Sequence, residues 1–125
     1  MGVRYKRYND LSSLDRRRRK ALRSLLFDGE EFIMAIDCKE GRLRSKTNRK
    51  LVLTDSRIIM FEKGLVGAES EDYSLDNVTS IQFDKGLRSS SIRLQGPGID
   101  DEYPAAKGHG EAFVKAAQKQ KHRDY

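Results

Sequence analysis

The feature that most constrains the fold is a pair of short, strongly β-prone segments joined by a tight turn. Residues 50–54 and 57–62 are rich in Leu, Ile, Val and Phe, and Thr54-Asp55-Ser56 connects them with side chains that favour turns. Both segments are apolar on each face, whereas a strand with one solvated face alternates apolar and polar residues. We therefore predict a hairpin of two central strands whose outer face is covered by another element.

Further segments with strand character follow at intervals of about ten residues, a spacing typical of β-sandwiches and barrels. These segments are residues 32–36, 69–75, 78–83, 91–95 and, with a weaker pattern, 99–103. Glycine-containing turns separate most of them, and a helix is predicted over 111–121, with Phe113, Ala116 and Ala117 on one face. The sequence thus predicts a mainly β fold, a barrel or sandwich of six or seven antiparallel strands with a C-terminal helix.

The length of 125 residues suits a single domain. A transmembrane helix needs about 20 apolar residues in succession, and the chain has no such run. A signal peptide is not expected either, because nine of the first 25 residues are basic. The single Cys38 fits a reducing compartment. We expect a cytoplasmic protein, with a peripheral position at the inner face of the membrane as one option.

The net charge of +6 is unevenly distributed along the chain. Residues 1–25 hold nine Lys and Arg against two acidic residues, a net charge of +7. The other 100 residues hold 16 basic against 17 acidic side chains, a net charge of −1. Basicity is therefore a property of the N-terminal segment, and the remainder is nearly neutral.

This N-terminal segment predicts a mobile basic arm over residues 1–11, followed by an amphipathic helix. Ser12 or Ser13 can cap the helix with Asp15 as a capping-box-like partner, and Asp28-Gly29 ends it. Leucines lie mostly on one stripe of this helix. The opposite face carries the candidate anion-binding residues Arg16, Arg17, Arg19, Lys20 and Arg23.

Three interpretations of the helix remain open at this point. Its apolar stripe can enter a bilayer while its arginines meet anionic headgroups. Its cations can instead contact nucleic-acid phosphates, with Tyr5 and Tyr8 available for stacking on bases. Alternatively, the stripe docks on the outward apolar face formed by Val52, Ile58 or Met60, an arrangement compatible with either binding role.

Four segments carry recognisable motifs: Leu26–Glu31 with Gly-Glu-Glu, Leu51–Phe61 with a Leu-Thr-Asp-x-Arg hairpin, a Lys-Gly turn at 63–67, and Tyr73–Ile81. Together these segments resemble the short prokaryotic PH-domain family, and the resemblance covers about residues 26–121. The resemblance implies a PH-like barrel with the C-terminal helix across one open end and Phe113 as a plug. Proteins similar to this family lie near membranes, act as adaptors or assemble into rings.

Lys39, Arg42 and Arg44 lie in the predicted connection between the first two strands. Eukaryotic PH domains that bind inositol phosphates have a Lys…Arg-x-Arg pattern there, so the resemblance implies that these three side chains contact phosphate. The alternative is a solvated basic loop that keeps an edge strand soluble.

The remaining candidate chemistry predicts no enzyme, no metal site and no cofactor. His109 and His122 are distant from Cys38 in the sequence and from each other, so they do not form a metal-ligand set. His109 is expected in a turn, and Asp100-Asp101-Glu102 in a solvated loop. We find no nucleophile elbow and no glycine-rich phosphate loop.

We divide the chain into a basic arm and helix (1–27), a PH-like domain (28–122) and a tail (123–125). The leading functional interpretation is a non-catalytic binding or adaptor module that engages an anionic membrane surface or a protein partner. The alternatives are nonspecific nucleic-acid binding through the arm, and a structural subunit that forms homo-oligomers.

Overall fold

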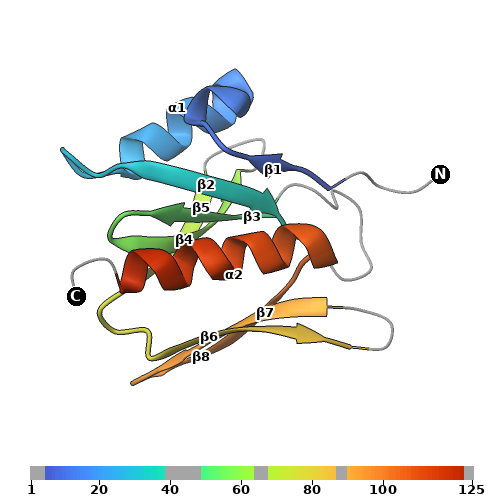
Figure 1. Ribbon diagram of the computed structural model, residues 1–125. Helices are drawn as coiled ribbons and strands as arrows, with labels where there is room; N and C mark the ends of the chain where they lie inside the picture. Colours follow the sequence, from blue (N-terminus) through green and yellow to red (C-terminus); the bar gives the residue numbers. More distant parts are fainter. Residues whose placement is uncertain (1–4, 39–48, 64–67, 87–89, 123–125) are drawn as a thin grey trace.

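The computed structural model describes residues 5–38, 49–63, 68–86 and 90–122, which form two antiparallel sheets and two α-helices (Figure 1). One sheet has the order β1-β2-β3-β4-β5 and the other β6-β7-β8. The strands are β1 Arg7–Tyr8, β2 Phe32–Asp37, β3 Arg49–Thr54, β4 Arg57–Lys63, β5 Ala68–Ser74, β6 Ser80–Lys85, β7 Ser90–Gly96 and β8 Ile99–Pro104. The helical segments are η1 Leu11–Ser13, α1 Arg16–Leu25 and α2 Lys107–Lys121. The predicted mainly β architecture with a C-terminal helix is confirmed.

The two sheets are not closed into a continuous barrel but contact each other at defined points. An isolated antiparallel bridge joins Cys38, just after β2, to Ala105, just after β8. Tyr73 of β5 and Tyr103 of β8 meet edge to face with ring centroids 6.3 Å apart. The Tyr73 hydroxyl also donates to Asp101 (2.8 Å), and burial is the main cause that raises its pKa. A PH-like sandwich therefore describes the fold better than a closed barrel.

The main core lies between the sheets and beneath α2, which runs across the molecule between them (Figure 1). Phe113 of α2 is fully buried in this core, the position expected of a plug. The helix begins at Lys107, earlier than the predicted 111, and His109 therefore lies in the helix rather than in a turn. Gly110 is needed for a close approach, because a Cβ there would lie 2.4 Å from the Cε1 atom of Phe83.

A second, smaller core lies on the outer face of the five-stranded sheet, where α1 covers it. Leu14 and Leu22 are buried against the sheet residues Ala35, Val52, Ile59 and Phe61. The docked interpretation of the helix therefore holds, and Val52 contributes as predicted. Ile58 and Met60 were assigned to the wrong face. Val52 pairs with Ile59, so the alternation of the strand turns Ile58 and Met60 toward the inner core.

The N-terminal segment is more ordered than predicted from Tyr5 onward. Strand β1 pairs with β2, and Asp37 holds it in place by accepting bonds from the Lys6 N–H (2.9 Å) and the Tyr8 hydroxyl (3.1 Å). Lys50 of β3 completes this anchor, with its Nζ 2.6 Å from Asp37, and both side chains are buried. Asp15 rather than a serine caps α1, by accepting the Arg18 N–H at 2.8 Å.

Candidate anion-binding surface

The candidate surface is the outer face of α1. Because Leu22 and its neighbours point into the sheet, the 3.6-residue period turns the basic side chains outward. Arg16, Arg17, Lys20 and Arg23 are all exposed, and the first three, with Ala21 and Ser24, line a shallow hollow of about 600 Å³. Four of the five helix residues predicted from the sequence are thus brought together on an open face.

Two other arginines of α1 make contacts within the protein. Arg19 is half-buried and its Nη1 donates to the Ser12 carbonyl at 3.4 Å. Arg18 forms an ion pair with the capping residue Asp15. Burial alone would raise the pKa of Asp15, but the hydrogen bonds from Arg18 outweigh it and lower this pKa. Helix α1 itself contains no acidic residue, and its capping residue Asp15 is already paired with Arg18. The exposed cations on the outer face of α1 therefore have no acidic partner from this helix.

Phe27 lies just beyond the end of α1 and is exposed to 65%, unusual for a large apolar side chain. Its ring stacks on the guanidinium of Arg57, with 4.2 Å between the Arg57 Cζ and the ring centroid. The stacking fixes the ring beside the helix end. An exposed aromatic side chain is therefore held in place at the C-terminal end of the helix that carries the clustered cations.

Arg57 of β4 connects the end of α1 to the sheet through four hydrogen bonds. Its Nε and Nη2 donate to Glu30 Oε2 and Oε1 at 2.8 and 2.9 Å, Nη1 donates to Asp72 at 2.7 Å, and Nη2 donates to the Leu25 carbonyl at 2.6 Å. The last contact places a positive charge at the C-terminal end of the helix, where the helix dipole favours it. We call Arg57, Glu30 and Asp72 the Arg57 clasp.

Glu30 also accepts hydrogen bonds from the hydroxyls of Thr54 (2.7 Å) and Ser56 (3.0 Å). Burial would raise the pKa of Glu30, but the bonds from Arg57, Thr54 and Ser56 lower it to about 2. The Gly-Glu-Glu and Thr-Asp-x-Arg motifs that resemble the PH-like family therefore meet in one polar cluster. Their role is to position α1 and the β3–β4 turn, a role that the sequence did not reveal.

The other predicted anion-binding residues, Lys39, Arg42 and Arg44, lie outside the described residues, and their role stays a prediction. Two cations that follow them in the sequence, Arg49 and Lys50 of β3, are described, and both are ion-paired. Arg49 contacts Glu62 at 3.3 Å, and Lys50 contacts Asp37 within the core. Lys50 therefore acts as a structural residue of the N-terminal anchor.

The other candidate groups have structural partners. Cys38 is fully buried. The acidic run belongs to β8, which confirms the weak strand predicted over 99–103 and not the solvated loop. Within this strand, Asp100 pairs with Arg93 (3.2 Å) and Glu102 accepts a bond from Ser91 (2.6 Å). Within the described ranges, no group of three His, Cys, Asp or Glu side chains is arranged to hold a metal ion. Neither helix described here is long and apolar enough to span a bilayer.

Two packed antiparallel sheets with a C-terminal helix across one opening define a PH-like domain, and the comparisons with known proteins agree. The family described as "Bacterial PH domain" matches residues 26–103, more than half of the chain, and the protein belongs to this family. This match begins after α1, whose basic surface therefore lies outside it. No curated protein matches the chain significantly in sequence.

Three solved structures share the fold at low sequence identity. The Vps36 N-terminal PH domain has a TM-score of 0.62 and 19% identity over 79% of this chain and 84% of its own. A DUF1696 family protein with a pleckstrin-homology domain from Shewanella loihica PV-4 has a TM-score of 0.60 and 16% identity, covering 82% and 91%. A pleckstrin homology domain from Shewanella amazonensis SB2B has a TM-score of 0.53 and 14% identity, covering 79% and 89%. PH-like domains are in general non-catalytic binding modules.

Proposed function

We propose that the protein is a binding module that attaches reversibly to anionic membrane surfaces at the inner face of the membrane through the outer face of α1. In this proposal the exposed cations meet headgroup phosphates, and Phe27 enters the interfacial layer. The contacts are made by Arg16, Arg17, Lys20 and Arg23, with Arg19 at the edge. The predicted loop residues Lys39, Arg42 and Arg44 would extend the same basic character.

The observation that carries the proposal is the placement of arginines at positions where they do not favour the helix. Arg16 to Arg19 occupy the first turn of α1, which contains no acidic residue. The positive end of the helix dipole disfavours cations there by about 0.3–1 kcal/mol each. Because the arginines do not stabilise the helix at these positions, we attribute their placement to the binding of an external anionic ligand.

The mode of attachment follows from what is already buried. The leucines of α1 pack on the sheet, so the helix docks with its polar face rather than inserting its apolar stripe. Each basic residue near an anionic surface contributes about 1 kcal/mol, and four or five such residues give weak, salt-sensitive binding. Phe27 adds a small apolar contribution that a purely electrostatic site lacks.

The structure favours a membrane over nucleic acid because of Tyr8. This side chain was a candidate for base stacking, but its hydroxyl bonds Asp37, and its ring lies 5.1 Å from the Lys50 Nζ. Tyr8 is therefore committed to the N-terminal anchor. The exposed large apolar side chain next to the end of α1 is Phe27, which suits a lipid interface.

Cosedimentation of the full chain with vesicles tests the proposal. We expect binding to vesicles that contain phosphatidylglycerol, no binding to pure phosphatidylcholine, and weaker binding at higher salt. The triple variant Arg16→Ala, Lys20→Ala, Arg23→Ala should bind roughly 100-fold more weakly, since three contributions of about 1 kcal/mol are lost. Phe27→Ser should weaken binding while preserving the salt dependence.

The matched control removes three exposed cations from α2, as Lys107→Ala, Lys115→Ala, Lys119→Ala. This variant has the same net charge as the first triple variant and should retain binding within about threefold if the α1 face is specific. Equal losses in the two triple variants would contradict the proposal. Tighter binding to duplex DNA than to anionic vesicles would favour the nucleic-acid interpretation instead.

A further inference from the structure

Strand β6 forms an edge of the three-stranded sheet and lies beside a hollow at the C-terminal end of α2. Within the described residues, β6 pairs with β7 alone. The hollow has a volume of about 380 Å³ and is lined by Thr79, Ser80, Ile81 and Gln82 from the strand and Gln118, Lys121 and His122 from the helix. A strand edge without a neighbouring strand, next to a groove, is the geometry used in β-strand addition.

The side chain of Gln118 bonds the strand edge directly. Its Nε2 donates to the Ile81 carbonyl at 3.0 Å, so this carbonyl points away from β7. In an antiparallel strand, the N–H and C=O of one residue point to the same side, and Ile81 therefore presents both groups at the edge. A glutamine amide has the chemistry of a peptide group, so Gln118 takes the place that the backbone of an added strand would occupy.

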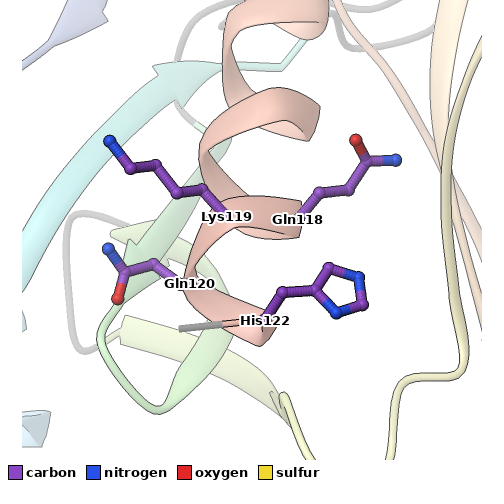
Figure 2. Close-up of a pocket in the computed structure, with 4 residues that line it drawn as sticks. All are labelled: Gln118, Lys119, Gln120 and His122. Carbon is purple, nitrogen blue, oxygen red and sulfur yellow. The ribbon is translucent and has the colours of Figure 1, made fainter. Parts of the chain in front are cut away.

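The charge at this end of α2 indicates the chemistry of a partner. Between Lys115 and His122 the helix carries three lysines and no acidic residue. Figure 2 shows Gln118 and His122 extending from one side of the helix and Lys119 and Gln120 from the other. These four residues line a second hollow of about 580 Å³ at the helix end, which shares Gln118 and His122 with the first.

We propose that the groove between β6 and the C-terminal end of α2 binds an extended acidic segment of a partner protein, which adds to the sheet as a strand beside β6. The backbone of this segment replaces the Gln118 amide at the Ile81 carbonyl and accepts the Ile81 N–H. Its acidic side chains lie near Lys121 and His122. Lys121 itself is anchored by a bond from its Nζ to the Leu75 carbonyl (2.9 Å), which keeps this cation at the groove.

This groove is separate from the membrane-binding surface. Helix α1 covers the outer face of the five-stranded sheet, whereas β6 belongs to the other sheet, and Figure 1 shows them on opposite sides of the molecule. The groove proposal therefore goes beyond the proposed function and does not depend on it. If both hold, the protein joins a membrane surface to a partner.

The test is an NMR titration of the full ¹⁵N-labelled chain with an acetylated and amidated heptapeptide, Glu-Val-Thr-Val-Glu-Val-Glu. We expect saturable shifts of the backbone amides of residues 79–82 and of the Gln118 side-chain amide. A peptide N-methylated at alternate residues lacks the strand N–H donors and should not bind. A version with Lys in place of Glu should bind at least fivefold more weakly.

Protein variants separate this groove from nonspecific attraction. Lys121→Gln combined with His122→Glu lowers the charge at the groove by about two units, keeps a donor for the Leu75 carbonyl, and should weaken binding about fivefold. Lys107→Glu makes the same charge change at the other end of α2 and should leave the affinity within about twofold. Gln118→Ala exposes the Ile81 carbonyl and should not weaken binding.

Four results would overturn the proposal: no shifts at millimolar peptide, shifts confined to α1 or β5, equal binding of the N-methylated peptide, or equal losses in the two charge variants.

Discussion

Replacing Arg57 with methionine should be among the most destabilising single substitutions in this protein. The change removes a guanidinium that makes four hydrogen bonds but keeps a side chain of similar length. Glu30, whose side chain is 2% exposed, would lose its only cationic partner in the clasp. The end of α1 would also lose the contact at the Leu25 carbonyl.

The magnitude follows from what remains after the substitution. Removing one partner of a buried ion pair leaves a buried charge without compensation and costs about 3–5 kcal/mol. With a urea m-value of about 1–3 kcal/mol/M for a domain of this size, the midpoint of unfolding should fall by about 1–5 M. The double variant Glu30→Gln, Arg57→Met should lose less than the sum of the two single variants, because the unpaired charge is removed.

Urea unfolding followed by circular dichroism measures these changes. The matched control is Arg93→Met, which breaks the exposed contact with Asp100 and should cost at most about 1 kcal/mol. If Arg57→Met and Arg93→Met lower the midpoint equally, the clasp does not have the stabilising role that we assign to it.

The same clasp predicts a dependence on pH. Hydrogen bonds from Arg57, Thr54 and Ser56 outweigh burial and lower the pKa of Glu30 from 4.5 to about 2. Because the pKa in the folded state lies below that in the unfolded state, the stabilisation is present above about pH 4.5 and is lost as the pH falls toward 2. The free energy of unfolding of the Glu30→Gln variant should therefore fall less over this interval than that of the wild type. Equal slopes for the two proteins would contradict the assignment.

Four further substitutions test the packing and the N-terminal anchor. Gly110→Ala should destabilise the fold by about 1–3 kcal/mol, because its Cβ would overlap the ring of Phe83. Gly108→Ala meets no atom within 4 Å and should stabilise the fold by up to about 1 kcal/mol. Thermal unfolding of the two variants tests this, and a more stable Gly110→Ala than Gly108→Ala would contradict the close approach at Gly110. Leu22→Ala should cost about 2–5 kcal/mol in urea, because the side chain is fully buried; a loss under 1 kcal/mol would argue against docking of α1. Tyr8→Phe removes one bond to Asp37 and should speed proteolysis of the N-terminal arm several-fold, and unchanged cleavage would show that this hydroxyl does not hold the arm.

The central strands could be predicted from the sequence because burial on both faces leaves a clear pattern. The apolar residues of β3 and β4 exceeded what one buried face requires, which correctly predicted a covering element. The error at Ile58 and Met60 came from the register, since a shift by one residue exchanges the two faces of a strand. The pairing of Val52 with Ile59 determines which residues of β4 face outward, and strand pairing cannot be read from the sequence of one strand alone.

The contacts of Arg57 and Asp37 could not be predicted, because their partners are distant in the sequence. The clasp joins residues 30, 57 and 72, and Arg57 also bonds the carbonyl of residue 25. The anchor joins residues 6, 8, 37 and 50. Neither charge stands out in the sequence of a chain with so many charged residues. A specific hint was available in the resemblance, where the Gly-Glu-Glu and Thr-Asp-x-Arg motifs contain the members of one cluster.

The presentation of the basic surface depends on these same contacts. Helix α1 has ten residues, fewer than the roughly 12–15 that an isolated helix needs for marginal stability, and the dipole disfavours the arginines in its first turn. Its helical form must therefore come from docking of Leu22 on the sheet and from the Arg57 clasp at its end. The cations can form one outward stripe only while the leucines remain buried. The membrane surface that we propose is thus a consequence of the second core, and loosening that core should weaken vesicle binding even when every basic side chain is retained.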